Sequence, residues 1–254
     1  MAKIHIAVEG ISGSGKTDLG TLLEKPPLLF SFIRGLNLDP EVKFFRERVD
    51  QNPFLKDFYE SGMKESFAFA SQMFYLNARF VTNMNIKNYE GIALEDRSIF
   101  GDGLFAKNLH DMGKLGKDAY EEYCRHRSSL TEIYKINEPD GIIFLDISVD
   151  TCINERLKKR KTGEALDYDY WGSLISQYRD EFKLVSQRIP TIWIDANIDF
   201  LKDEKYVKNV TRKANNLLKR IIEKKNRDAS TVQQKLSMGD KPKIPSATVQ
   251  KPLL

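Results

Sequence analysis

An eight-residue segment near the N-terminus has the spacing of a phosphate-binding loop. Residues 10–17 read Gly-Ile-Ser-Gly-Ser-Gly-Lys-Thr and fit the pattern G-x-x-x-x-G-K-[ST] without a gap. The glycines would let the backbone turn so that several N–H groups point at one phosphate of a nucleoside triphosphate. Lys16 would reach the β- and γ-phosphates, and the Thr17 hydroxyl would hold Mg²⁺. The expected contacts to the triphosphate are Gly10, Ser12, Gly13, Ser14, Gly15, Lys16 and Thr17.

Charged side chains also follow two other segments that read as strands. Glu47 lies near the end of the segment 42–49, and Asp96 and Arg97 follow the apolar run 91–94. Parallel α/β sheets place their sites at the carboxyl ends of strands. A carboxylate there suits Mg²⁺ and an arginine suits phosphate oxygens. Taken alone, Glu47 is better explained as a solvated charge between two arginines.

A third group of chemically useful side chains lies on one predicted helix, residues 66–81. Phe69, Gln72, Leu76 and Arg79 recur at helical spacing and therefore share a stripe. Such a stripe can stack on a flat ring and hydrogen-bond to its edge. A core helix whose Gln and Arg bond to nearby backbone groups explains the same pattern equally well.

These groups need a scaffold that brings strand ends together. Short apolar or alternating runs predict strands, and runs with apolar residues at helical spacing predict helices. The predicted strands are 4–8, 42–49, 91–94, 142–147 and 191–195. The predicted helices are 18–25, 66–81, 104–127 with a break near residue 112, 151–160, 170–185 and 206–225. Alternation of the two predicts a three-layer α/β P-loop NTPase fold, with a parallel sheet of about five strands flanked by helices.

The organisation along the chain predicts one domain, residues 1–225. Within it, residues 28–40 read as a surface insertion. Residues 152–168 contain a basic run that is either a solvated face or a lid that closes over phosphates. Residues 226–254 are rich in Ser, Thr, Gln, Lys and Pro, and we expect a disordered basic tail there.

Composition excludes several classes of protein. The 254 residues carry a formal net charge of +4, and the excess lies after residue 220, where basic residues outnumber acidic ones seven to three. The rest of the chain is neutral, so no nucleic-acid surface is expected. The only cysteines, Cys124 and Cys152, form no C-x-x-C pair, which suits a reducing compartment. With no visible signal peptide and no apolar run long enough to cross a bilayer, we expect a cytoplasmic protein without membrane contact.

Taken together, these motifs resemble the deoxynucleoside kinase family from residue 4 to about residue 206. The family has Glu-Pro-Val where this chain has Glu47-Arg48-Val49, and Tyr59 stands where the family has its sugar-binding Tyr. Gln72 and Arg79 match the Gln and Arg of the family's base-binding helix. Asp96-Arg97-Ser98 matches the family's [DE]-R-S motif, and Asp102 matches an Asp that contacts the base.

The lid segment matches the family only in part. Arg156 and Arg160 match two lid arginines, whereas Thr162 and Ala165 replace a further arginine and a sugar-contacting Glu. Glu164 is the candidate to substitute for that Glu. The segment from Asn197 to Phe200, which includes Asp199, looks like the loop that holds the adenine of ATP. The stretch between Tyr59 and Gln72 is slightly longer than in the family.

The resemblance implies transfer of phosphate from ATP to the 5′-hydroxyl of a deoxynucleoside, with Mg²⁺ as cofactor and a homodimer as the expected state. Glu47 would accept the hydroxyl proton, and Arg97 would orient Glu47 and the 5′-oxygen. Lys16, Arg156 and Arg160 would neutralise charge on the transferring group, and Thr17 and Asp96 would hold the metal. The implied nucleoside contacts are Tyr59, Phe69, Gln72, Arg79, Asp102 and Glu164.

The base preference follows from Gln72, Arg79 and Asp102. An amide discriminates weakly because it offers a donor and an acceptor, whereas an ionised carboxylate only accepts, which favours a base with an amino group. The resemblance favours purines, with deoxyadenosine first.

Two other functions stay open: a nucleoside monophosphate kinase such as a thymidylate kinase, and a non-catalytic structural protein of the same fold. A GTPase is discounted because Asn137-Glu138-Pro139-Asp140 lacks the Lys of the N-K-x-D motif.

Overall fold

The fold is built on one parallel sheet. The computed structural model describes residues 3–25, 41–160, 163–199 and 202–237. Its strands are β1 (Ile4–Glu9), β2 (Val42–Phe45), β3 (Ile92–Asp96), β4 (Gly141–Asp146) and β5 (Thr191–Asp195), in the order β2-β3-β1-β4-β5. Every pairing is parallel. The predicted five-stranded parallel sheet is therefore confirmed.

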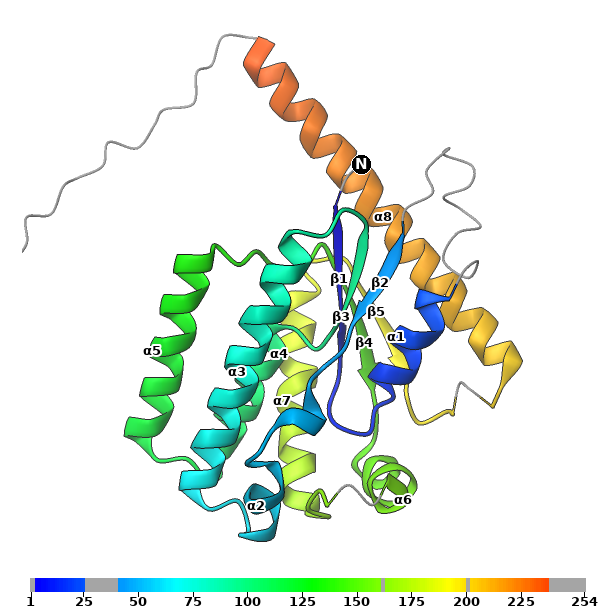
Figure 1. Ribbon diagram of the computed structural model, residues 1–254. Coiled ribbons are helices and arrows are strands. Elements are labelled where there is room, and N and C mark those ends of the chain that lie inside the picture. The colour runs from blue at the N-terminus through cyan, green and yellow to red at the C-terminus, as the bar shows by residue number, and fades with distance from the viewer. Residues whose placement is uncertain (1–2, 26–40, 161–162, 200–201, 238–254) are drawn as a thin grey trace, which may run out of the picture.

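Helices cover both faces of this sheet (Figure 1). The helices are α1 (Lys16–Glu24), α2 (Leu55–Glu60), α3 (Glu65–Lys87), α4 (Ile99–Asp111), α5 (Lys117–Tyr134), α6 (Lys158–Arg160), α7 (Tyr168–Val185) and α8 (Glu204–Ser237). A π-helical segment, Thr151–Leu157, leads directly into α6, and a 3-10 turn covers Val49–Gln51. Helices α1 and α8 lie on one face, while α3, α4 and α7 lie on the other with α5 outside them.

The core explains why β4 reads as a continuous apolar run. A strand that is buried on both faces has no solvent side on which to place polar residues. The Phe144 ring stacks on Phe182 of α7 with 5.1 Å between ring centroids, and it meets Trp193 of β5 edge-on at 4.4 Å. Burial of such a side chain contributes roughly 1.5–3 kcal/mol.

Two predicted boundaries are wrong. Strand β2 ends at Phe45 rather than at residue 49, so Glu47 lies in the loop that follows it. Helix α8 continues to Ser237, so the predicted disordered tail is wrong for residues 226–237. Those residues hold good helix formers and neither Gly nor Pro, and the first such breaker is Gly239. The predicted insertion at 28–40 and the tail beyond residue 237 lie outside the described residues.

Candidate active site

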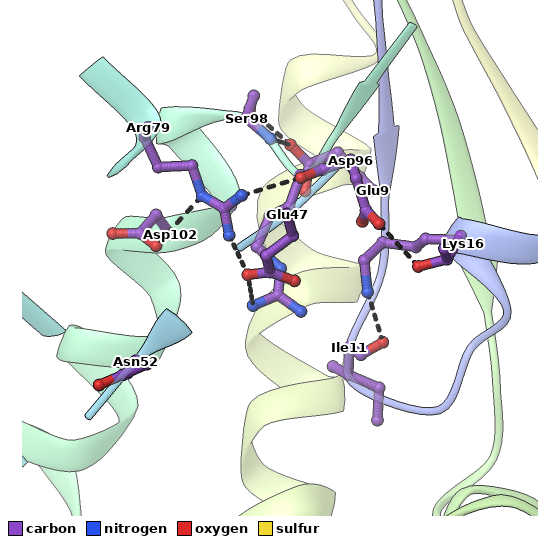
Figure 2. A network of polar contacts seen from close by, with 12 residues as sticks. Glu9, Ile11, Lys16, Glu47, Asn52, Arg79, Asp96, Ser98 and Asp102 are labelled. Carbon is purple, nitrogen blue, oxygen red and sulfur yellow. Dashed lines mark hydrogen bonds and ion pairs between the residues drawn. The ribbon is translucent and has the colours of Figure 1, made fainter. Parts of the chain in front are cut away.

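The phosphate-binding loop lies between β1 and α1, at the carboxyl edge of the sheet. Gly15 precedes α1 with a φ of 89°, in the left-handed region that favours glycine, and Gly13 has a φ of 82°. The loop therefore opens directly onto the N-terminus of α1, where backbone N–H groups favour an anion. Lys16 is buried, donates to the carbonyl of Ile11 at 3.0 Å, and burial lowers its pKa to about 8 (Figure 2).

Thr17 and Asp96 form the candidate metal site. The Thr17 Oγ1 atom donates to Asp96 Oδ2 at 2.8 Å. Asp96 Oδ1 is buried and has no hydrogen-bond partner among the described residues, and burial raises the pKa of this carboxyl group. Mg²⁺ is usually held by one or two protein oxygens together with phosphate oxygens and water. A hydroxyl and a carboxylate beside the phosphate-binding loop fit that requirement.

Glu47 is held by two arginines from separate elements. Arg79 of α3 donates from Nη2 to Glu47 Oε1, and Arg97 Nη1 lies 3.5 Å from the same oxygen. All three side chains are buried or nearly so. Burial acts to raise the pKa of Glu47, but the two guanidinium groups outweigh it and lower this pKa to about 2. The reading of Glu47 as a solvated surface charge is therefore wrong.

Arg97 occupies an unusual backbone conformation at the end of β3. Its φ is 63°, in the left-handed region that few residues other than glycine adopt. The guanidinium lies over the Phe105 ring, with 4.2 Å between Arg97 Cζ and the ring centroid. This packing directs the Arg97 side chain toward Glu47.

Arg79 also contacts the residue expected to read the base. Its Nε atom lies 3.4 Å from Asp102 Oδ1, and the hydroxyl of Tyr123 donates to Asp102 Oδ2 at 2.8 Å. Burial raises the pKa of Asp102, although both contacts are ones that an ionised carboxylate would accept. Gln72 is buried nearby, and its Oε1 has no hydrogen-bond partner among the described residues.

A small cavity connects these groups. Its volume is about 40 Å³, little more than one water molecule occupies. Polar and aromatic side chains line it: Ser12, Glu47, Tyr59, Ser71, Gln72, Tyr75, Arg97, Asp102, Phe105, Glu164 and Tyr170, with Val49, Leu55 and Phe58. Four of the residues predicted to contact the nucleoside thus meet Glu47 and the phosphate-binding loop in one place.

Phe69 lies elsewhere. It is partly buried against the hydrophobic core and is not among the residues that line this cavity. That Phe69 packs on the base therefore stays a prediction, without support from the lining of this cavity. Tyr75, two turns of α3 further on, lines the cavity instead, together with Phe105 and Tyr170.

The lid segment begins against the phosphate-binding loop. The Cys152 thiol contacts the carbonyl of Ser12 at 3.4 Å, and Arg156 Nη1 lies 3.5 Å from Asp199 Oδ2. Two residues that were predicted to bind ATP are thus paired. Arg160 is exposed on α6, and Phe200 lies outside the described residues.

Sequence reasoning missed two polar residues of this site. Glu9 is fully buried and its carboxylate accepts from Ser98, while burial raises its pKa to about 7. An acidic residue that ends a mostly apolar strand was the available signal. Tyr123 gave no such signal, because only the tertiary fold brings its helix against Asp102.

A larger cavity, of about 200 Å³, lies at the opposite edge of the sheet among Lys3, His5 and Lys225. It is remote from the phosphate-binding loop, and none of the predicted site residues lines it. Its size therefore carries less weight than the chemistry of the smaller cavity.

Comparisons with known proteins agree with this geometry. A family model described as deoxynucleoside kinase matches residues 6–219. A deoxyadenosine kinase from Dictyostelium discoideum is 32% identical over 192 residues, which are 75% of this chain and 71% of that protein. A deoxyguanosine kinase from Lactobacillus johnsonii is 30% identical over 208 residues, 78% of this chain and 85% of that protein.

A solved structure extends the likeness to the fold. The deoxyadenosine kinase from M. mycoides with bound dATP matches with a TM-score of 0.66 and 25% identity, over 82% of this chain and all of that one. No helix within the described ranges is both long and apolar enough to cross a membrane.

Proposed function

The chain belongs to the deoxynucleoside kinase family, and on that premise we propose that it transfers the γ-phosphoryl group of ATP to the 5′-hydroxyl of a purine deoxynucleoside. The observation that carries the proposal is the meeting of Glu47, Gln72 and Asp102 in one cavity, beside Ser12 of the phosphate-binding loop. A proton acceptor, a base-recognising pair and a phosphate site are the parts that such a transfer needs.

Glu47 takes the proton of the 5′-hydroxyl as its oxygen attacks phosphorus. A pKa near 2 makes Glu47 a weak base, but it keeps the carboxylate ionised and ready to accept throughout the neutral range. Arg97 and Arg79 hold this carboxylate in place, so the proton acceptor is oriented before the substrate arrives.

Lys16 supplies positive charge where the transferring phosphoryl group becomes most negative. In the free enzyme its ammonium group is satisfied by the Ile11 carbonyl, and a bound triphosphate would replace that contact. Arg156, whose Cβ lies beside Gly13 and whose guanidinium pairs with Asp199 in the free enzyme, is the second cation that we assign to the triphosphate.

Mg²⁺ fits the pair of Thr17 and Asp96 described above. The chemistry that the ion would supply there is partial neutralisation of the charge on the phosphates. The groups that we assign to this role are the Thr17 hydroxyl and the Asp96 Oδ1 atom, which has no hydrogen-bond partner in the described part of the chain.

The proposed base preference rests on two lines of support, of which the first favours an amino-bearing base and the second a purine. Asp102, held by Arg79 and Tyr123, presents acceptors that favour an exocyclic amino group. Relatives of this chain are named deoxyadenosine kinase and deoxyguanosine kinase. A 40 Å³ cavity is too small for a nucleoside, so binding requires its lining to open, as lids and loops do in many kinases.

The test is a panel of the four deoxynucleosides and their 5′-monophosphates with ATP and Mg²⁺. We expect deoxyadenosine to give the highest kcat/KM and the monophosphates to be poor acceptors. A monophosphate as the best acceptor would instead identify a nucleoside monophosphate kinase. No turnover with any acceptor would contradict the proposal.

A further inference from the structure

Glu9 joins the phosphate-binding loop to the turn that carries Arg97. It is the last residue of β1, immediately before Gly10, and its side chain is fully buried. The Glu9 Oε1 atom accepts from the Ser98 backbone N–H at 2.8 Å and from the Ser98 hydroxyl at 2.5 Å. Figure 2 shows this carboxylate beside Ser98.

The turn that Glu9 holds is one that the backbone does not favour. Arg97 has a φ of 63°, in the left-handed region that is unfavourable for any residue other than glycine. Its own N–H donates to the carbonyl of Val8 at 3.0 Å. Together with the two bonds from Ser98 to Glu9, this contact fixes the turn from both sides.

Ser98 links the turn at Arg97 to the first turn of α4. It is the N-cap of that helix, and its Oγ accepts from the Phe100 N–H at 3.2 Å while donating to Glu9. The second carboxylate oxygen of Glu9 lies against Gly101, where an added Cβ would be only 2.2 Å away. The first turn of α4 is thus shaped around this carboxylate, and α4 also carries Phe105, on which Arg97 rests.

We propose that Glu9 is a positioning residue for Arg97. By accepting both hydrogen bonds from Ser98, it holds the left-handed turn that places the Arg97 guanidinium 3.5 Å from Glu47. The inference rests on the proposed role of Arg97 in the phosphoryl transfer. It predicts that the reach of the Glu9 side chain matters for kcat, and that its charge matters much less.

A matched pair of variants separates reach from charge. Glu9→Gln keeps the side-chain length and an acceptor oxygen for Ser98, but removes the charge. Glu9→Asp keeps the charge but shortens the side chain by one methylene, which withdraws the acceptor from Ser98. We expect kcat to stay within about threefold of wild type for Glu9→Gln and to fall about tenfold or more for Glu9→Asp, with KM for ATP little changed in both.

The same pair in an Arg97→Ala background tests whether Glu9 acts through Arg97. If it does, Glu9→Asp lowers kcat by less than about twofold once Arg97 is gone, because effects of residues that act together are not additive. Thermal melting of every variant shows whether each is folded. Should Arg97→Ala not fold, Ser98→Ala serves instead, and we expect a loss of kcat between those of the two Glu9 variants.

Two results would overturn the inference. One is a loss of kcat in Glu9→Gln as large as that in Glu9→Asp. The other is a rise in KM for ATP at constant kcat, which would place the role of Glu9 in the phosphate-binding loop. If the wild-type enzyme itself lacked deoxynucleoside kinase activity, the proposed function would be contradicted. That result is distinct from the two above, which are read from the variants of an active enzyme.

Discussion

Arg79 contacts both Glu47 and Asp102 through one guanidinium group, so a single side chain of α3 joins the proposed proton acceptor to the residue proposed to recognise the base. A third contact, from Nη1 to the Asp96 carbonyl at 2.8 Å, ties the same group to the end of β3. Burial alone would lower the pKa of Arg79, but the carboxylates of Glu47 and Asp102 outweigh it and raise the pKa. Arg79 is therefore a permanent cation in this network.

This arrangement changes how substitutions at Arg79 should be understood. The sequence assigned Arg79 to base recognition and Arg97 to Glu47, whereas the structure gives both arginines a contact with Glu47. Replacing Arg79 would leave the buried carboxylates of Glu47 and Asp102 with less positive charge beside them. Removing one partner of a buried ion pair commonly lowers the free energy of unfolding by about 3–5 kcal/mol. Base selectivity is better tested at Asp102.

Glu47→Gln tests the role of Glu47 as proton acceptor. We expect kcat to fall roughly 10²-fold or more, the usual scale for loss of a general base, with a modest change in KM for ATP. The amide can still bond to Arg79, so the variant is expected to fold. Unchanged kcat with a raised KM for the nucleoside would show that Glu47 only positions the substrate.

The same carboxylate predicts a dependence of stability on pH. The pKa of Glu47 is lowered from 4.5 to about 2 in the folded protein, so its ionisation stabilises the native state above pH 4.5 and this contribution is lost as pH falls toward 2. The full contribution is roughly 3 kcal/mol. In urea unfolding we expect wild type to be more stable than Glu47→Gln at pH 7, and the difference to narrow below pH 4.5. A difference that is independent of pH would contradict this.

Lys16→Ala tests the phosphate site. A cation at the transferring phosphoryl group contributes several kcal/mol in such sites, so we expect loss of measurable turnover in a protein that still folds. Removing a buried cation whose pKa is already lowered by burial should not reduce the melting temperature strongly. Near-normal turnover by the folded Lys16→Ala variant would contradict the proposal that this protein is a kinase.

Much of the fold and part of the site could be predicted from the sequence because local patterns encode them. Residues 10–17 carry the phosphate-binding loop in an unbroken motif, and the buried β4 run needs no tertiary information. The pairing of Thr17 with Asp96 follows once both lie at the carboxyl edge of adjacent strands, since β1 and β3 are neighbours.

The parts that could not be predicted depend on how helices pack. Tyr123 reaches Asp102 only because α5 lies against α4, and no spacing in the chain encodes that contact. Phe69 shares a helical stripe with Gln72, but a stripe of α3 spans both the core and the cavity. The periodicity of a sequence predicts which residues share a face of a helix, but it does not predict which other element each turn of that face contacts.

Truncation after Lys225 tests the contribution of the last turns of α8. These turns extend beyond the other elements in Figure 1, and the side chains of Asn226, Arg227, Asp228, Ser230 and Thr231 are exposed. Lys225, which pairs with Asp140 at 2.7 Å, is retained. We therefore expect the melting temperature and kcat to be nearly unchanged while the helical circular dichroism signal falls. A drop of many degrees would show that residues after 225 dock on the protein.

Base choice is the prediction that depends most directly on the Arg79–Asp102 pair. Both Asp102 oxygens accept hydrogen bonds, as the oxygens of an ionised carboxylate do. Because such a group only accepts, it favours an amino group on the base and repels a carbonyl oxygen. A buried polar group left unpaired costs about 1–3 kcal/mol, enough for roughly tenfold or greater selection. We expect deoxyadenosine, deoxyguanosine and deoxycytidine to exceed thymidine in kcat/KM.

Asp102→Ala is the variant that tests the cause of this selection. It removes the carboxylate that disfavours thymine while Arg79 keeps its contact with Glu47, so we expect thymidine to gain about tenfold relative to deoxyadenosine. Tyr123→Phe is the matched control: it removes one donor to Asp102 but keeps the carboxylate, and we expect thymidine to remain the poorest substrate. Thymidine as the best substrate of the wild type, or no relative gain in Asp102→Ala, would show that the base is selected elsewhere.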